Sequence, residues 1–179
     1  MRRVSVVGVS GSGKTTIARA LAAKLSAPLT ELDGLMHQAG WQPRPEGEFR
    51  AEVERATSQP TWVIDGNYRQ VVIEGPVWQH ADTVVWLDMP RLTAMRRLFA
   101  RTLRRAVTRE VLWNGNREPL SNFVSVDPEK SVFVWSWITY EGLRRRYAAA
   151  MTDPAWSHLT FVRLRSTAET RRWLESIAP

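Results

Sequence analysis

Residues 8–16, with the sequence GVSGSGKTT, have the residue types and spacing of a phosphate-binding loop. Gly8, Gly13, Lys14 and Thr15 match the pattern Gly-x-x-x-x-Gly-Lys-Thr. Glycines let backbone N–H groups turn inward around an anion, with no Cβ in the way. The lysine adds a compact positive charge, and the threonine hydroxyl can bind Mg²⁺. The alternative is a glycine-rich turn that only connects a strand to a helix.

The loop is followed by an apolar helical pattern over residues 15–25, so the N-terminus of a helix points at the same anion. We therefore predict that the backbone amides of residues 11–15 contact a nucleotide phosphate. The predicted contacts from this segment are Gly8, Gly11, Ser12, Gly13, Lys14, Thr15 and Thr16.

The positive charge is concentrated in one segment. The net charge is +7, and residues 91–150 account for all of it, with 12 basic and 5 acidic residues. Such a segment suits nucleotide phosphates, nucleic acid or an anionic membrane surface. The chain has no cysteine, which excludes disulfides and thiolate metal sites and fits a cytoplasmic protein. No apolar run is long enough to cross a membrane, and no signal peptide is visible.

Within that segment, arginines recur every four residues on a predicted helix, at positions 97, 101, 105 and 109. Aligned arginines repel one another by a few tenths of a kcal/mol per pair unless an anion or acidic side chains face them. The stripe therefore predicts either a phosphate-binding face or a solvated face with intrachain ion pairs. Nucleic-acid binding is a third interpretation, with base-stacking residues at Trp113, Trp135, Trp137, Tyr140 and Tyr147. No nucleic-acid recognition signature accompanies them.

Apolar patterning predicts strands at residues 4–7, 28–32, 61–64, 83–87 and 159–164. Helices are predicted at residues 15–25, 48–57, 91–112, 129–151 and 167–177. Strands alternating with helices indicate an α/β fold whose parallel sheet is covered on both faces. We expect one domain over residues 1–179. The polar stretch 113–128 is an insertion between helices, and such loops are often active-site lids.

Several of these motifs together resemble the nucleoside-monophosphate-kinase-like group of P-loop kinases, which includes adenylate kinase and shikimate kinase. They are the glycine loop, VIDGNYR at 63–69, VVWLDMP at 84–90 and the arginine-rich helix. The segments DGNY and LWNGNRE and the tryptophan-rich stretch are similar to those of bacterial topology modulation proteins, which are adenylate-kinase-like ATPases. The resemblance implies a three-layer α/β/α fold with a five-stranded parallel sheet in the order 2-3-1-4-5 and a helical lid insertion.

The resemblance also implies roles for the residues that end the third and fifth strands. Asp65 would hold Mg²⁺ with Thr15, although a turn aspartate before Gly66 is the alternative. Arg69 would contact the acceptor or the transferred phosphate, unless it is a solvated surface residue. Arg165 would lie in the turn that contacts adenine, where Ser166 or Thr167 can also cap the last helix.

Asp88 ends the fourth strand and has two interpretations. It is either a second magnesium carboxylate or the cap of the helix that begins near Arg91. In the resembled group, arginines of the lid clamp ATP phosphates and neutralise charge during transfer. That role falls on Arg101, Arg105, Arg109 and Arg117.

The acceptor side depends on Asp33, which follows the second strand at the edge where doubly wound folds bind ligands. Phosphoryl transfer to a hydroxyl needs a group that orients the nucleophile. An aspartate in this region binds the acceptor in shikimate-kinase-like enzymes, so we assign Asp33 this role; a turn residue before Gly34 is the alternative. His37 and Trp41 follow in the same loop. The AMP-binding signature of adenylate kinase is not recognisable between residues 30 and 60.

We therefore predict a phosphotransferase that binds ATP and Mg²⁺ and transfers the γ-phosphoryl group to a small nucleotide or hydroxylated metabolite. Its predicted catalytic residues are Lys14, Asp33, Arg69, Arg101, Arg105, Arg109 and Arg117. An ATPase or regulatory ATP binder without an acceptor remains the first alternative, and a nucleic-acid-binding protein that affects DNA topology the second. A monomer or a homodimer fits the sequence.

Overall fold

The computed structural model describes residues 1–118, 123, 125, 127 and 131–177. Five parallel strands form one sheet in the order β2-β3-β1-β4-β5, which confirms the predicted α/β fold and strand order. The strands are β1 (Arg3–Gly8), β2 (Leu29–Glu31), β3 (Trp62–Asp65), β4 (Thr83–Leu87) and β5 (Thr160–Leu164). The helices are α1 (Lys14–Leu25), α2 (Leu32–Met36), α3 (Glu46–Thr57), α4 (Arg69–Val72), α5 (Pro76–His80), α6 (Arg91–Thr108), α8 (Val132–Ala150) and α9 (Thr167–Ser176). Short 3₁₀ turns are η1 (Ala39–Trp41), η2 (Trp113–Gly115) and η3 (Pro154–Trp156).

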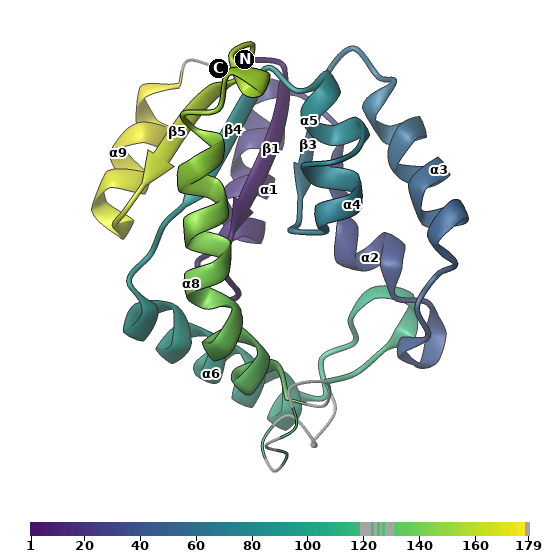
Figure 1. The fold of residues 1–179 in the computed structure, drawn as a ribbon. Helices are drawn as coiled ribbons and strands as arrows, with labels where there is room; N and C mark the ends of the chain where they lie inside the picture. The colour runs from purple at the N-terminus through teal and green to yellow at the C-terminus, as the bar shows by residue number, and fades with distance from the viewer. Residues whose placement is uncertain (119–122, 124, 126, 128–130, 178–179) are drawn as a thin grey trace.

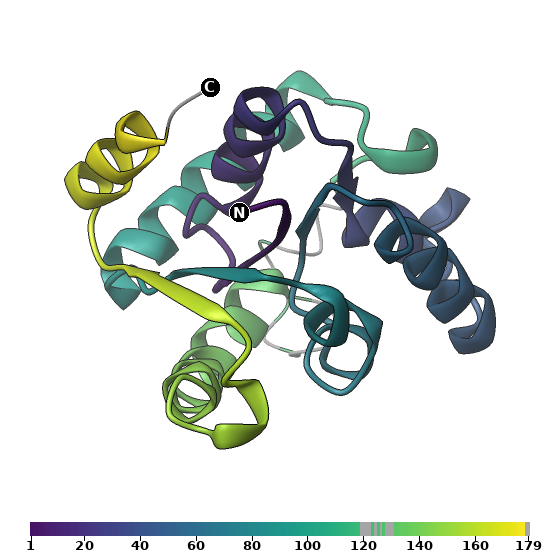
Figure 2. The same ribbon diagram turned by 90° about the horizontal axis from the view of Figure 1, so that it is seen from above.

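Helices cover both faces of the sheet, as Figures 1 and 2 show. Successive strand residues point to opposite faces, so each strand contributes to two cores. Val6 and Val85 pack with α1 and α9, whereas Val7 and Trp86 pack with α3, α5 and α8. Both faces are apolar, which explains the nearly continuous hydrophobic runs of β1 and β4.

Several predicted element boundaries differ from those of the structure. The helix predicted to reach residue 112 ends at Thr108, because Arg109 adopts a left-handed φ of +49°. The second strand ends at Glu31, and α2 begins at once, so Asp33 lies on a short helix and not in a loop. The helix predicted from residue 48 begins at Glu46, and that predicted from residue 129 begins, in its described part, at Val132.

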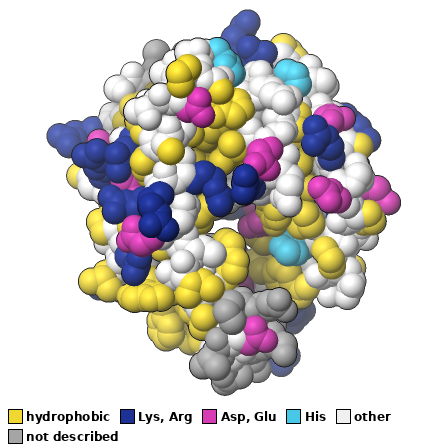
Figure 3. Space-filling model, in the orientation of Figure 1, with side chains coloured by type: hydrophobic (Ala, Val, Ile, Leu, Met, Phe, Trp, Pro, Cys, Tyr) yellow, Lys and Arg dark blue, Asp and Glu magenta, His cyan; other side chains and the backbone are white. Residues whose placement is uncertain are grey.

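The carboxyl ends of the parallel strands lie at one edge of the sheet, and α6 crosses below that edge (Figure 1). The space-filling view in the same orientation is hollowed near the centre of the face (Figure 3). Lys and Arg side chains gather at the upper edge of this hollow. Of the predicted lid, only residues 113–118, 123, 125 and 127 belong to the described residues. No helix in the described ranges is long and apolar enough to span a membrane.

Candidate active site

The glycine loop connects β1 to α1 and packs against α6. Gly11 has φ +78°, and a Cβ on this residue would lie 2.1 Å from the carbonyl oxygen of Ala94 in α6. Gly13, with φ +99°, directly precedes the first residue of α1. Only glycine fits these two positions, because of the positive φ at both and the lack of room at Gly11. The loop therefore holds α6 close to the N-terminus of α1.

A cavity of about 810 Å³ opens at this point, a size typical of small-ligand sites. It is formed by the glycine loop, the start of α1, the inner side of α6 and the start of α9. The predicted site residues that line it are Gly11, Ser12, Gly13, Lys14, Thr15, Thr16, Arg101 and Arg105. Gly8 is not among them; it is buried at the end of β1, where its N–H donates to Asn67 Oδ1 at 3.1 Å.

Thr15 and Asp65 lie side by side at the edge of this cavity. The Thr15 hydroxyl donates to Asp65 Oδ2 at 2.6 Å. Asp65 is only 6% exposed, and burial raises its pKa, an effect that the charge of Lys14 opposes. The other carboxylate oxygen, Oδ1, is buried and has no hydrogen-bond partner among the described residues.

This pair fits a magnesium ion, because hydroxyl and carboxylate oxygens are its preferred protein ligands. The unpartnered Oδ1 of Asp65 leaves an acceptor available for a metal-bound water. The described residues contain no cluster of three or more acidic or histidine side chains. Mg²⁺ takes one or two protein ligands and completes its shell with phosphates and water.

Lys14 lines the cavity at the end of the glycine loop. Its Nζ donates to the carbonyl of Val9 at 3.2 Å, within the glycine loop. Burial lowers the pKa of Lys14, while the charges of Asp65 and Asp33 raise it. The charge of Lys14 thus interacts with both the predicted metal residue, Asp65, and the predicted acceptor residue, Asp33.

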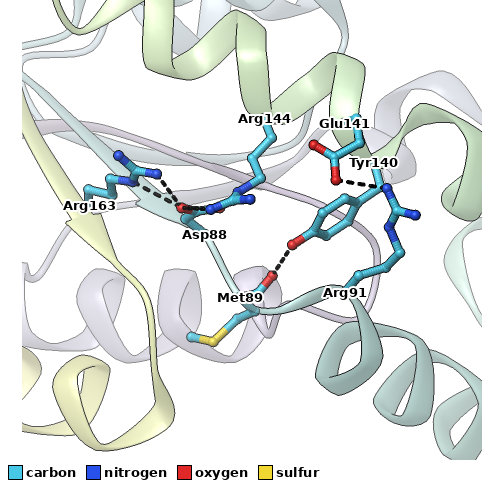
Figure 4. Close-up of polar contacts among 7 residues, drawn as sticks. All are labelled: Asp88, Met89, Arg91, Tyr140, Glu141, Arg144 and Arg163. Carbon is cyan, nitrogen blue, oxygen red and sulfur yellow. Dashed lines mark hydrogen bonds and ion pairs between the residues drawn. The ribbon is translucent and has the colours of Figure 1, made fainter.

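Asp88 has neither of the roles predicted for it. It points to the opposite face of the sheet from Asp65, where Arg144 Nε donates to Oδ1 at 2.6 Å and Arg163 Nη2 donates to Oδ2 at 2.6 Å. Figure 4 shows the two arginines approaching the carboxylate from opposite sides. Pro90 precedes α6, and no side chain caps that helix. Asp88 therefore forms ion pairs with both arginines and links α8 and β5 to the end of β4.

The arginine stripe of α6 is only partly directed into the cavity. Arg101 lines it, and burial together with the neighbouring Arg105 lowers the pKa of Arg101. Arg105 also lines it and lies 3.7 Å from Glu118 and 3.8 Å from Glu110. The stripe thus has features of both interpretations, because some of its arginines line the cavity and Arg105 also has acidic partners. Arg97, which we did not assign to the site, lines the cavity and donates to Ser12 O at 3.4 Å.

Besides Gly8, six predicted site residues do not line the cavity: Asp33, Asp65, Arg69, Arg109, Arg117 and Arg165. Arg109 is exposed at the end of α6, and Arg117 is exposed in the turn after η2. Arg69 is exposed and pairs with Glu74, its Nε donating at 2.7 Å. Arg165 is exposed as well, although Thr167 and Thr170 of the same region line the cavity.

The cap predicted for the last helix is confirmed. The Ser166 hydroxyl accepts from the N–H of Glu169 at 3.1 Å, and the Glu169 carboxylate accepts from the N–H of Arg165 at 2.6 Å. This reciprocal arrangement satisfies N–H groups that the first turn of a helix leaves free.

Asp33, which we predicted for the acceptor side, lies close to His37 and Trp41 of the same segment. Asp33 accepts a hydrogen bond from the hydroxyl of Tyr68 at 2.8 Å, and His37 Nε2 lies 3.4 Å from the same hydroxyl. The ring of His37 packs edge-on against Trp41 at 5.3 Å. Tyr68, which sequence reasoning missed as a site residue, is the group that connects them. Tyr68 is the last residue of the DGNY segment, and this segment was the sequence signal that could have identified it as a site residue.

The turn from Leu112 to Arg117 docks against this acceptor loop. Trp113 donates its indole N–H to Glu31 at 2.9 Å and lies against Gly34, where a Cβ would be 2.7 Å from its ring. Asn114 Nδ2 donates to the carbonyl of His37 at 2.6 Å. Trp113 and Glu31 also line the cavity. The first part of the predicted lid thus joins the phosphate cavity to the acceptor loop.

The aromatic residues considered for nucleic acid do not form one surface. Tyr140 and Tyr147 are buried in the core beneath α8, while Trp135 and Trp137 are exposed on its first turns. Arg91 lies 4.8 Å from the ring of Trp137 and pairs with Glu141, as Figure 4 shows for the ion pair.

Comparison with known proteins agrees with this geometry. A sequence profile of the ATPase family associated with various cellular activities (AAA) matches residues 4–66, which include the glycine loop and Asp65. The shikimate kinase of Synechococcus elongatus is 30% identical over 133 residues, covering 63% of this chain and 70% of that enzyme.

Solved structures share the fold. A shikimate kinase from Bacteroides thetaiotaomicron has a TM-score of 0.55 at 17% identity and covers 97% of this chain and 94% of its own. The Acinetobacter baumannii shikimate kinase in complex with shikimate has a TM-score of 0.54 at 17% identity, and the match covers 98% of this chain and 89% of that enzyme. A sugar kinase from Janibacter has a TM-score of 0.52 at 21% identity, and the match covers 98% of this chain and 93% of that enzyme.

The fold and the phosphate cavity define a small P-loop kinase. The chain belongs to the shikimate kinase-like family of these enzymes. It is an ATP-dependent phosphotransferase that transfers phosphate from ATP to a small hydroxylated metabolite.

Proposed function

We propose that the enzyme binds ATP with Mg²⁺ in the 810 Å³ cavity and phosphorylates a hydroxyl group held at Asp33. The observation that carries this proposal is the Thr15–Asp65 pair beside Lys14, with one buried carboxylate oxygen unpartnered among the described residues. Mg²⁺ would be held by Thr15 and, through water, by Asp65, and it would neutralise charge on the β- and γ-phosphates.

Each residue then has a task in the transfer. Lys14 and the loop amides hold the β- and γ-phosphates, and Arg101 and Arg105 face the charge that develops on the transferred group. Asp33 orients the attacking hydroxyl and accepts its proton. The hydroxyl oxygen forms a bond to the γ-phosphorus as the bond to the β–γ bridging oxygen breaks, and ADP leaves.

The remaining arginines have weaker support. We propose that Arg69 reaches the acceptor only when its exposed pair with Glu74 opens, because exposed ion pairs are worth about 0–1 kcal/mol. Arg109 and Arg117 would contact ATP only after the 113–128 lid moves, and Arg165 would contact adenine through its backbone.

The relatives support a hydroxylated carbon compound as acceptor, since those compared are named as shikimate and sugar kinases. Within the family, we propose that the nearest group is the topology modulation proteins, on the strength of DGNY and LWNGNRE. The enzyme would act in the cytoplasm, where ATP is plentiful.

A coupled ADP-release screen tests the proposal. The panel contains shikimate, gluconate, other sugars and polyols, and nucleoside monophosphates, each with ATP and Mg²⁺. We expect acceptor-dependent ADP release that falls about 100- to 1,000-fold in Lys14→Ala, as when one preorganised charge-stabilising donor is lost. Asp33→Ala should abolish the acceptor dependence. If Asp33→Ala leaves ATP turnover intact across the whole panel, the enzyme is an ATPase without an acceptor.

A further inference from the structure

Tyr68 lies where two acceptor-side segments meet. It follows β3 directly before α4, and its ring packs edge-on against Phe49 of α3 at 5.1 Å. From this half-buried position, its hydroxyl donates to Asp33 Oδ1 at 2.8 Å. The Tyr68 side chain therefore links the end of β3 to helix α2 through this hydrogen bond.

Among the described residues, Tyr68 is the only hydrogen-bond partner of the Asp33 side chain. Asp33 is exposed on α2, a helix of five residues, and its second oxygen, Oδ2, makes no hydrogen bond to any described residue. A free carboxylate on so short a helix can occupy several rotamers, and fixing it removes that entropy before the acceptor binds.

The Tyr68 hydroxyl remains a donor at all physiological pH values. Burial, and then the charge of Asp33, raise the pKa of the phenol well above its ordinary value of 10.0. A phenol has a single proton, and here that proton is committed to Asp33 Oδ1. His37 Nε2 lies 3.4 Å from the same phenol oxygen, whose lone pairs remain available to accept a hydrogen bond.

We propose that Tyr68 is a positioning residue that fixes the Asp33 carboxylate, so that Oδ2 accepts the hydroxyl of the phosphoryl acceptor. The proposal rests on the proposed function, in which Asp33 contacts the acceptor. During transfer, the acceptor proton moves to Asp33 Oδ2 while Tyr68 keeps its own. The neighbouring Arg69 does not share this task, because it pairs with Glu74.

A double-mutant cycle tests the proposal, with Tyr68→Phe, Asp33→Asn and the combined variant. The probe is ATP with Mg²⁺ and the compound that the screen turns over fastest. Tyr68→Phe should lower kcat about 10- to 100-fold through misplacement of one group, with the KM for ATP unchanged. In the Asp33→Asn background, Tyr68→Phe should have less than about a twofold further effect, because the two residues act together.

Tyr140→Phe is the matched control. It removes the hydroxyl of a buried tyrosine that donates to the carbonyl of Met89 at 2.8 Å, and it should leave kcat unchanged. If Tyr68→Phe lowers kcat by the same factor in the Asp33→Asn background, Tyr68 has a structural role and the proposal is wrong. It is also wrong if Tyr68→Phe alone leaves kcat unchanged.

A spectroscopic measurement needs no acceptor. The chain has three tyrosines, so the ¹³Cζ resonance of Tyr68 can be assigned by its loss in Tyr68→Phe. We expect this resonance to shift in Asp33→Asn and to stay in place in Tyr140→Phe. An unchanged resonance in Asp33→Asn would disprove the contact. A shifted resonance together with full phosphoryl transfer in Asp33→Asn would instead refute the acceptor role of Asp33.

Discussion

Replacing Gly11 by alanine tests whether the glycine loop and α6 are packed as closely as the site requires. A Cβ at Gly11 would lie 2.1 Å from Ala94 O and 2.9 Å from Leu98 N, both backbone atoms of α6. Neither atom can move without displacing the helix. Gly115 provides a control, because its φ of +79° nearly equals the +78° of Gly11 and a Cβ there would meet no atom of the described residues within 4 Å.

The two substitutions share one cost and differ in the other. An alanine at such a φ costs about 1–2 kcal/mol. Gly11→Ala adds overpacking against α6, about 1–3 kcal/mol. For a domain of this size, each kcal/mol lowers Tm by about 2–4 °C. We therefore expect the Tm of Gly11→Ala to fall below that of Gly115→Ala by about 2–12 °C.

Thermal unfolding followed by circular dichroism measures this difference, and ATP titration of the folded proteins completes the test. Because α6 carries Arg97 and Arg101 into the cavity, Gly11→Ala should weaken ATP binding more than Gly115→Ala does. Equal Tm values for the two variants would refute the packing of the loop against α6.

Three further predictions concern stability and charge. Burial raises the folded-state pKa of Asp65 above its ordinary value of 3.8. The stabilisation from the protonated carboxyl group is therefore fully present below pH 3.8 and is lost as the pH rises through the folded-state pKa. Asp65→Asn should thus gain Tm relative to the wild type as the pH rises from about 4 to 7, while phosphoryl transfer is lost; a parallel fall of both proteins would contradict this. Asp88→Ala should lower the free energy of unfolding in urea by about 2–4 kcal/mol, because two arginines lose their buried partner, and leave kcat per folded molecule unchanged. Trp113→Phe should cost about 1.5–3 kcal/mol in the same assay, since Glu31 loses a donor, whereas the exposed Trp135→Phe should cost little.

The glycine loop was predictable because it is local in sequence. Gly11, Gly13, Lys14 and Thr15 occupy one continuous turn, and their chemistry depends on spacing along the chain. The parallel sheet followed from the alternation of apolar strands and amphipathic helices. For Asp65, local pattern was not enough, and its proposed magnesium role came from a family resemblance. In the structure, Asp65 Oδ2 lies 2.6 Å from the Thr15 hydroxyl.

Asp88 shows why a strand-ending aspartate is ambiguous in sequence. Asp65 and Asp88 both end apolar strands, but they point to opposite faces because side chains alternate along a strand. Register therefore decides which carboxylate meets Thr15 and which meets Arg144 and Arg163. The sequence does not state register between distant strands.

By itself, the sequence determined the fold class, the order of elements and a phosphate loop with one lysine, because these follow from local pattern and from residue chemistry. Only the tertiary structure decided which arginines of α6 line the cavity and that Tyr68 holds Asp33. These contacts join residues 35 to 85 positions apart. They depend on how helices and loops pack at the sheet edge, where a rotation or a one-residue shift would exchange one partner for another.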